Sequence, residues 1–262
     1  MNNVNKTLYI PLYGKAYVSK MGIILHDARA EEIWEKEGFK LKGKSKSKWL
    51  AYYMGMRSRV FDNWVKEQIG KENDTVVIHI GCGMDSRAER IGASSVCWYD
   101  VDFPQVIAER KKYYSETEDY KMISADARHT DWLAQIKKSE HAIIVMEGLC
   151  MYLSPEETRA LMSDISNHFN RVNILMDCYT VFAAKASKYK NPINDVGVTE
   201  VYGIDDPKAI ETKNSIAFVR EHNMTPDDLI NELSGLEKAI FNKLYAGKIS
   251  KKMYRLYEFG KE

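Results

Sequence analysis

The chain has 262 residues, enough for one large domain or for one domain with a small cap. Apolar residues make up 45% and charged residues 29%, and 38 Lys and Arg against 37 Asp and Glu leave a net charge of +1. This balance argues against a protein built mainly to coat nucleic acid. No apolar run approaches the ~20 residues that cross a bilayer, and the first residues lack the apolar core of a signal peptide.

Four cysteines, Cys82, Cys97, Cys150 and Cys178, are widely spaced and form no C-x-x-C pair. Disulfide frameworks have denser patterns, so we expect four free thiols in a cytoplasmic protein. No His or Cys pair has the spacing of metal ligands, so no metal site is predicted.

Residues 1–70 are predicted to form a helical cap that is part of the same domain as residues 71–262. Two helices are expected, over Asp27–Glu37 and Ser47–Ile69. In the second, apolar residues recur at spacings of three or four, which is typical of a helix packed on a sheet. These residues are Trp49, Tyr53, Met56, Val60 and Trp64. Gly70 is expected to end the helix.

The segment Gly38–Ser45 matches the P-loop pattern G-x-x-x-x-G-K-[ST]. A phosphate loop requires a buried strand before it, whereas Glu31–Glu37 is charged and helical, so we reject this interpretation. The lysines at 40, 42, 44, 46 and 48 alternate with small or apolar residues. They are typical of a solvated loop, and the alternative is a lid or a patch that attracts acidic substrates.

Short apolar runs alternate with helical segments from residue 71 onward. Strands are predicted over Thr75–Ile80, Ser95–Asp102, Tyr120–Ser124, His141–Met146 and Val172–Asp177. Pro104 is expected to begin one helix, and Ser154–Glu157 has the pattern of a capping box. Because continuous apolar runs suit strands buried on both faces, this order predicts an α/β fold with a doubly wound, mostly parallel, Rossmann-like sheet.

The pattern weakens after residue 180. Residues 180–215 are predicted to form a substrate-side insertion, and Thr225–Asp228 has the pattern of a helix start. Met253–Phe259 alternates enough to be a final strand, which would suit an antiparallel edge of the sheet.

Polar motifs follow the ends of four predicted strands. Gly81 and Gly83 would permit a tight turn and close approach of a ligand, although Ser86 stands where the dinucleotide fingerprint has a third glycine. Asp102 lies 19 residues after Gly83, where a carboxylate is expected to accept hydrogen bonds from ribose hydroxyls. Asp100 shares its face of the strand, so one of the two is expected to bind ribose and the other to cap the following loop.

Two further acids complete this set. Asp126 could accept a hydrogen bond from an adenine amine or could only face a helix N-terminus. Glu147 ends an apolar run and is therefore a buried carboxylate that needs a partner. Because ligands of open α/β sheets bind beyond the carboxyl ends of the strands, the four motifs together indicate one nucleoside site.

These same segments resemble the successive motifs of the leucine carboxyl methyltransferase family. They are Ile80–Arg87, Trp98–Pro104, Ala125–Arg128 and Glu147–Leu153. Ile10–Ala16, Asp27–Ile33 and Arg57–Asp62 are similar to the bacterial branch, which modifies polyketides and other small molecules. The resemblance covers roughly residues 8–180.

The resemblance implies a class I methyltransferase with S-adenosylmethionine as cofactor and S-adenosylhomocysteine as product. It implies that Arg59, assisted by Lys15, holds the methionine carboxylate, a bidentate match for a guanidinium. Gly81 and Gly83 would line the methionine and ribose, Asp102 would bind the ribose hydroxyls, Asp126 with Ala127 would bind adenine, and Glu147 would lie near the methionine amino group. Ser86 stands where threonine is commoner, and Ala127 where a larger apolar residue is commoner.

Methyl transfer requires the acceptor oxygen, the methyl carbon and the sulfur to be nearly in line. A carboxylate acceptor is ionised at neutral pH and needs no base, whereas a hydroxyl acceptor needs one. Tyr152 is the first catalytic candidate, and His26, Asp27 and Asp177 are further candidates for a base.

We therefore expect an O-methyltransferase that acts on a carboxylate or hydroxyl of a small molecule, without nucleic acid or membrane partners. Two alternatives stay open. One is methylation of a protein C-terminal carboxylate, and the other is a non-catalytic protein that binds S-adenosylmethionine or S-adenosylhomocysteine. A nicotinamide dehydrogenase is disfavoured by the missing third glycine.

Overall fold

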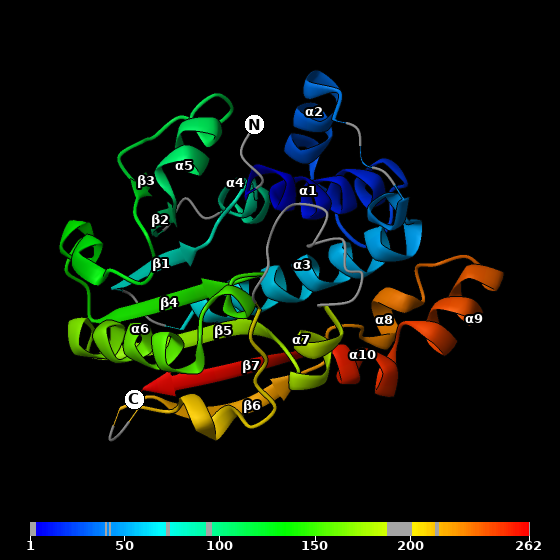
Figure 1. Cartoon of the computed structure of the whole chain (residues 1–262). Helices are drawn as coiled ribbons and strands as arrows, with labels where there is room; N and C mark the ends of the chain where they lie inside the picture. Colours follow the sequence, from blue (N-terminus) through cyan, green and yellow to red (C-terminus); the bar gives the residue numbers. More distant parts are fainter. Residues whose placement is uncertain are drawn as a thin grey trace.

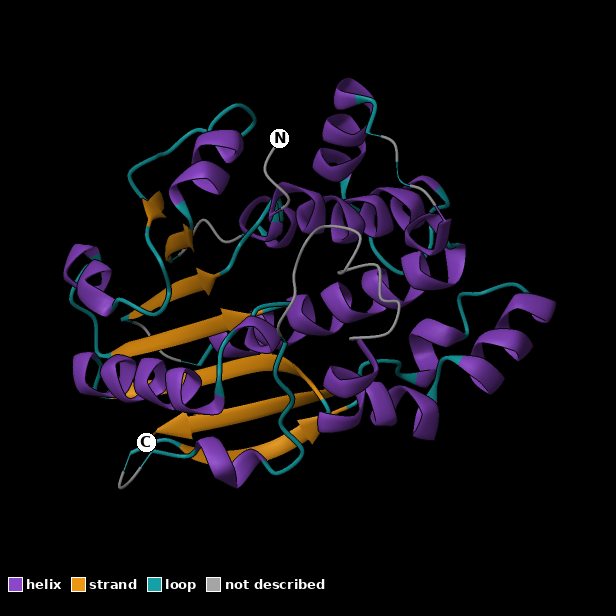
Figure 2. Cartoon of the chain, in the orientation of Figure 1, coloured by secondary structure: helices purple, strands orange, loops and turns teal. Residues whose placement is uncertain are grey.

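The computed structural model describes residues 4–261 except 40, 42, 72–73, 93–95, 188–200 and 213–214. Its centre is a seven-stranded sheet in the order β3-β2-β1-β4-β5-β7-β6, with helices on both faces (Figures 1 and 2). The strands are β1 (Thr75–Ile80), β2 (Cys97–Asp102), β3 (Tyr120–Ser124), β4 (His141–Met146), β5 (Arg171–Tyr179), β6 (Ala217–His222) and β7 (Tyr254–Lys261). β1 to β5 are mutually parallel, which confirms the predicted Rossmann-like α/β class.

The apolar runs form the central strands because both of their faces are covered. Every residue of β1 and β4 is buried. On one face Ile78 and Ile144 pack with α6 (Pro155–His168) and the 3-10 helix η2 (Thr130–Gln135). On the other face Val77 and Ile143 pack with α3 (Lys48–Ile69) and α9 (Gly235–Leu244). Continuous apolar strands are therefore favoured here over alternating ones.

Local helix signals in the sequence are confirmed. Ser154 and Glu157 form the reciprocal capping box of α6. Asp27 caps α2 (Ala28–Glu37) by accepting a hydrogen bond from the amide of Ala30 at 2.9 Å. Pro104 begins α5 (Pro104–Arg110), and Ile69 is the last residue of α3.

The final strand is antiparallel, as predicted, but it is not the edge of the sheet. β7 lies between β5 and β6 and pairs with both in antiparallel fashion. The edge strand β6 was not predicted, because its residues are all exposed or only partly buried and its apolar run, Ala217–Val219, is short.

The first helix, α1 (Val4–Lys20), was also not predicted, since Pro11 lies inside it and proline removes an internal hydrogen bond. α1 crosses α3 closely at Gly14, where a Cβ atom would lie 2.7 Å from Cβ of Met54. This close crossing brings Lys15 of α1 and Met54 of α3 to one cavity.

The remaining helices of the described residues are short, with at most seven residues each. They are α4 (Arg87–Ile91), α7 (Val181–Ser187), α8 (Asp227–Ile230), α10 (Gly247–Met253) and the 3-10 helices η1 (Gly43–Lys46), η3 (Cys150–Tyr152) and η5 (Pro207–Ile210). Glu31–Glu37 is helical, so the P-loop match lacks the strand that it requires. Two of the predicted loop lysines, at 40 and 42, and much of the predicted insertion, at 188–200, lie outside the described residues.

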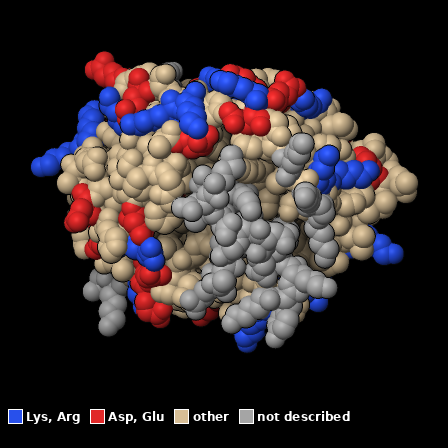
Figure 3. Space-filling view, turned by 45° about the horizontal axis from the view of Figure 1, so that its top comes forward, with Lys and Arg blue, Asp and Glu red and all other residues tan. Residues whose placement is uncertain are grey.

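Positive and negative side chains lie next to one another around the face drawn in Figure 3. This mixture agrees with a net charge of +1. Within the described ranges, none of the helices has the length and apolar character needed to cross a bilayer.

Candidate functional site

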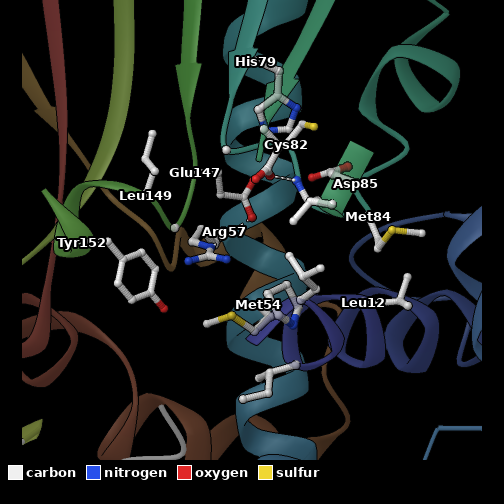
Figure 4. Close-up of a pocket in the computed structure, with 18 of the residues that line it drawn as sticks. Leu12, Met54, Arg57, His79, Cys82, Met84, Asp85, Glu147, Leu149 and Tyr152 are labelled. Atoms are coloured by element: carbon white, nitrogen blue, oxygen red, sulfur yellow. Dashed lines mark hydrogen bonds and ion pairs between the residues drawn. The ribbon is translucent and has the colours of Figure 1, made fainter. Parts of the chain in front are cut away.

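A cavity of about 210 Å³ lies at the carboxyl ends of β1, β2 and β4, beneath α1 and α3. Figure 4 shows Arg57 of α3, Glu147 after β4 and Tyr152 of η3 projecting toward it. A second cavity of about 220 Å³ extends to Asp126 and Ala127. The two share five lining residues, Gly81, Asp102, Phe103, Leu149 and Tyr152, and so form one elongated site.

The glycine loop after β1 presents bare backbone to this site. Gly81 and Gly83 have φ values of 71° and 52°, in the left-handed region that favours glycine. A Cβ atom on Gly81 would lie 3.2 Å from Cβ of Leu149, and one on Gly83 would lie 3.2 Å from a methyl carbon of Leu8. Side chains at either position would therefore strain the turn and fill the space where a ligand could approach the backbone.

Asp102 lines both cavities. Its two oxygens accept hydrogen bonds from the amides of Gly83, at 2.8 Å, and Phe103, at 2.7 Å. Each carboxylate oxygen has a further lone pair, so the group can still accept hydrogen bonds from a ligand. Burial raises the pKa of Asp102 to about 6, although the two amides and the charge of Arg110 act in the opposite direction.

Asp100 does not cap the following loop, as was expected of the second acid, because Asp102 itself binds the amide of Phe103 there. Asp100 does not line either cavity, and it accepts hydrogen bonds from Nε1 of Trp98 at 2.8 Å and from the hydroxyl of Tyr120 at 2.5 Å. It also pairs with Arg110. Asp102, and not Asp100, is therefore the acid that faces the site.

Glu147 has the partners that a buried carboxylate requires. Its Oε1 accepts hydrogen bonds from Nε of Arg57 at 3.1 Å and from the hydroxyl of Ser58 at 3.0 Å, while Oε2 binds Arg87. Burial opposes its ionisation, but the charges of Arg57 and Arg87 prevail and hold its pKa at about 2. The carboxylate lines the cavity with much of its acceptor capacity already in use.

Lys15 reaches the same cavity from α1. Its Nζ lies 2.9 Å from Oδ2 of Asp85, and both side chains are buried. Asp85 also pairs with Arg87 at 3.4 Å and Arg90 at 3.0 Å. Burial opposes ionisation of Asp85, but these three cations lower its pKa well below the usual range.

The arginine at the cavity is Arg57, not Arg59. Arg59 is partly exposed and lines neither cavity, whereas Arg57 is buried and lines the first. Two residues along a helix correspond to a rotation of about 200°, so the two side chains leave α3 on opposite sides. The assignment to Arg59 is corrected accordingly.

Arg57 is held by two carboxylates. Its Nε binds Glu147 and its Nη1 donates to Oδ2 of Asp177 at 2.9 Å. Among the described residues no acceptor is bonded to Nη2, so this nitrogen is able to bind a ligand. Sequence analysis missed Arg57, although it lies in the same R-x-R segment, because the spacing alone does not show which face of the helix points inward.

Tyrosine and methionine side chains form part of the lining of the first cavity. These are Met54, Met151, Tyr152, Tyr179 and Tyr254. The rings of Tyr179 and Tyr254 meet edge to face, with centroids 4.7 Å apart. Burial raises the pKa of both Tyr152 and Tyr254, so their hydroxyls stay protonated and act as hydrogen-bond donors at neutral pH.

The other candidates for a base do not face the cavities. His26 is exposed and lines neither cavity. Asp27 caps α2 and pairs with Arg90 at 2.7 Å. Asp177 is buried between Arg57 and the amide of Gly148, which donates to it at 2.5 Å. His79 does line the first cavity, but burial lowers its pKa to about 4 and leaves the ring neutral.

Asp126 and Ala127 lie in the second cavity. Arg128 binds both oxygens of Asp126, with Nε at 3.0 Å and Nη2 at 2.6 Å, and these hydrogen bonds lower the pKa of the carboxyl. Asp126 is therefore ionised and already oriented by its neighbour. Within the described part of the chain, no three His, Cys, Asp or Glu side chains are grouped as metal ligands.

The chain is similar to known methyltransferases in sequence. The family model for leucine carboxyl methyltransferase matches residues 8–166. The tetracenomycin polyketide synthesis O-methyltransferase TcmP of Streptomyces glaucescens is 27% identical over 244 residues, which are 91% of this chain and 89% of that protein. The S-adenosyl-L-methionine-dependent methyltransferase dpfgK of Gibberella zeae is 23% identical over 237 residues, which are 81% of this chain and 79% of that protein.

A solved structure shares the fold. Magnesium protoporphyrin IX methyltransferase (ChlM) from Synechocystis PCC 6803 with bound SAH has a TM-score of 0.54 to this chain at 14% sequence identity. The match covers 98% of this chain and 100% of that one.

Proposed function

The chain belongs to the leucine carboxyl methyltransferase family, and we propose that it transfers a methyl group to a carboxylate of a small molecule. Family and relatives make it an S-adenosylmethionine-dependent O-methyltransferase. A small-molecule acceptor is supported by TcmP, whose name assigns it to polyketide synthesis. The narrower choice of a carboxylate over a hydroxyl rests on the chemistry of the cavity.

The side chains of the site fit S-adenosylmethionine, which supplies an electrophilic methyl group on its sulfonium sulfur. Bare backbone at Gly81 and Gly83 leaves room for the ligand, and Asp102 has free lone pairs for the ribose hydroxyls. We assign the methionine carboxylate to Arg57 with Lys15, because both cations line the first cavity. Adenine is assigned to the second cavity.

The remaining cofactor contacts follow from this arrangement. Asp126 and Ala127 are proposed to bind adenine. Glu147 lies at the cavity near Arg57, and we propose that it contacts the methionine amino group. Tyr152 lines both cavities, and we propose that its protonated hydroxyl orients the acceptor.

One observation carries the choice of a carboxylate: the described side chains around the first cavity provide no suitable base. The carboxylates of Glu147 and Asp85 are ion-paired with lowered pKa values, and His79 has a pKa of about 4. Tyr152 remains protonated, and Asp102 is assigned to the ribose. A carboxylate acceptor is already ionised at neutral pH, so positioning and exclusion of water suffice for it.

The proposal predicts that the product is a methyl ester. A metabolite extract incubated with the enzyme and methyl-labelled S-adenosylmethionine should gain label that mild alkali releases as volatile methanol. Methyl ethers resist the same treatment, so label retained after alkali would contradict the choice of a carboxylate. A peptide pool run in parallel should stay unlabelled, and labelled peptides would support the alternative of a protein C-terminal acceptor. Tight cofactor binding with no transfer to either pool would favour a binding protein.

Acceptor choice is proposed to lie with residues 1–60 of the cap and with the insertion, residues 180–215. Leu8, Leu50 and Met54 of the cap line the first cavity. All four cysteines are free thiols, which suits the cytoplasmic location that we propose.

Binding of S-adenosylhomocysteine should weaken at acidic pH. The ionised form of Asp102 accepts hydrogen bonds, and its pKa is about 6 because of burial, so protonation below that pH removes acceptor capacity. Affinity should be constant above about pH 7 and should fall toward tenfold per pH unit below pH 6, as measured by calorimetry. Asp102→Asn should bind weakly with a flat profile, and an unchanged slope in that variant would show that another group titrates.

A further inference from the structure

We propose that Arg110 and Tyr114 are positioning residues, which hold the glycine loop from the side away from the cofactor so that Asp102 keeps the orientation that binds ribose. Neither residue lines the cofactor cavities. The inference rests on the proposed placement of the cofactor at Gly81 and Gly83. Arg110 and Tyr114 would not contact the cofactor, and they would influence its binding through the backbone of the glycine loop.

The peptide groups of Gly83 are bound on both sides. Its N–H donates to Oδ2 of Asp102 at 2.8 Å, and its carbonyl accepts a hydrogen bond from Nη1 of Arg110 at 3.0 Å. The next carbonyl, of Met84, accepts a hydrogen bond from the hydroxyl of Tyr114 at 3.1 Å. Because Gly83 has a φ of 52° and no side chain, these contacts determine the direction of its N–H.

Arg110 is itself fixed in place. Its Nη2 binds Asp100, its Nε donates to the hydroxyl of Tyr120 at 3.1 Å, and its guanidinium lies over the ring of Tyr114 at 4.1 Å. Arg110 and Asp100 are both buried. A buried guanidinium that is neutralised by a carboxylate is a strong, directed donor, and its planar fork can bind Asp100 and the loop carbonyl together.

The two hydrogen bonds from Arg110 and Tyr114 to the loop carbonyls form a clamp. Its effect depends on the empty space beside these two residues. Arg110, Tyr114 and Tyr120 line a separate cavity of about 350 Å³, which shares no lining residue with the two cavities of the proposed cofactor site. The clamp lies between this cavity and the loop. Without the two hydrogen bonds, the carbonyls of Gly83 and Met84 would lose the donors that fix their direction, and the Gly83 N–H would be free to turn away from Asp102.

A double-mutant cycle tests the proposal. Arg110→Lys retains the charge beside Asp100 but lacks the fork that reaches both Asp100 and Gly83. We expect it to weaken S-adenosylhomocysteine binding about tenfold, equivalent to about 1.4 kcal/mol. In the Asp102→Asn background the same change should have less than about a twofold effect, because the Gly83–Asp102 contact is already impaired.

The outcomes separate this inference from the cofactor assignment. An unchanged affinity in Arg110→Lys, or the same fold-change in both backgrounds, would overturn the clamp, since a merely structural role gives additive effects. Wild-type affinity in Asp102→Asn alone would instead remove the cofactor placement, and the clamp with it.

A matched pair of tyrosine variants covers the case in which Arg110→Lys does not fold. Tyr114→Phe removes only the hydroxyl that binds Met84, and we expect about threefold weaker binding. Tyr113→Phe is the control, because its hydroxyl donates to Glu37 at the surface rather than to a carbonyl of the loop. Equal affinities in the two variants would contradict the proposal.

Discussion

Asp102→Asn is expected to weaken binding of S-adenosylhomocysteine by about a hundredfold, equivalent to about 2.7 kcal/mol. The carboxylate can accept from two ribose hydroxyls, and hydrogen bonds to a charged acceptor contribute about 1.5–3 kcal/mol each. The amide keeps the size of the side chain but replaces one acceptor oxygen with a donor, which also opposes the amide of Gly83 or Phe103. Isothermal titration calorimetry at neutral pH measures the effect.

Asp131→Asn is the matched control for this variant. Asp131 is exposed on η2 and lines neither cavity. The affinity of Asp131→Asn for S-adenosylhomocysteine should therefore equal that of the wild type. If Asp102→Asn bound the ligand as tightly as this control, the nucleoside would have to lie elsewhere.

Arg57→Gln is expected to lower the free energy of unfolding by about 3–5 kcal/mol and to abolish measurable cofactor binding. The arginine pairs with Glu147 and Asp177, both buried, so its replacement removes the cation paired with Asp177 and one of the two paired with Glu147. Arg59→Gln is the matched control two residues along the same helix. Arg59→Gln should change the free energy of unfolding by less than about 1 kcal/mol, because Arg59 is partly exposed and does not pair with Glu147 or Asp177.

The pH dependence of this loss has a defined sign. In the wild type the folded-state pKa of Glu147 is about 2, below its unfolded value, so its contribution is present above about pH 4.5 and is lost as pH falls toward 2. In Arg57→Gln the buried carboxyls should bind protons more readily in the folded than in the unfolded state. The stability deficit should therefore shrink between about pH 7.5 and 5, as measured by urea denaturation. A deficit that grows at low pH, or an equal deficit in Arg59→Gln, would contradict this account.

Much of the fold was predictable because its signals are local. The apolar runs of β1 and β4 are long enough to be strands buried on both faces, and Ser154 with Glu157 marks the start of α6 within four residues. Strand β6 and helix α1 escaped prediction, since β6 is largely exposed and Pro11 interrupts the helical pattern. Their formation depends on partners, β7 for the strand and α3 for the helix.

Sequence spacing by itself determined which strand ends would meet at one cavity. Gly81, Gly83, Asp102 and Glu147 all follow or end apolar strands, and parallel strands bring their carboxyl ends to one edge of the sheet. That inference needs only the chain order and the direction of the strands.

Only the tertiary structure decided between neighbouring residues of the same type. Arg57 and Arg59 are equivalent in the sequence, but docking of α3 against the sheet buries one beside Glu147 and leaves the other partly exposed. Asp100 and Asp102 are separated in the same way, by Arg110 of α5 on one side and the Gly83 amide on the other. The physical reason is that a side chain's role depends on the charges packed against it, and those charges come from segments far apart in the chain.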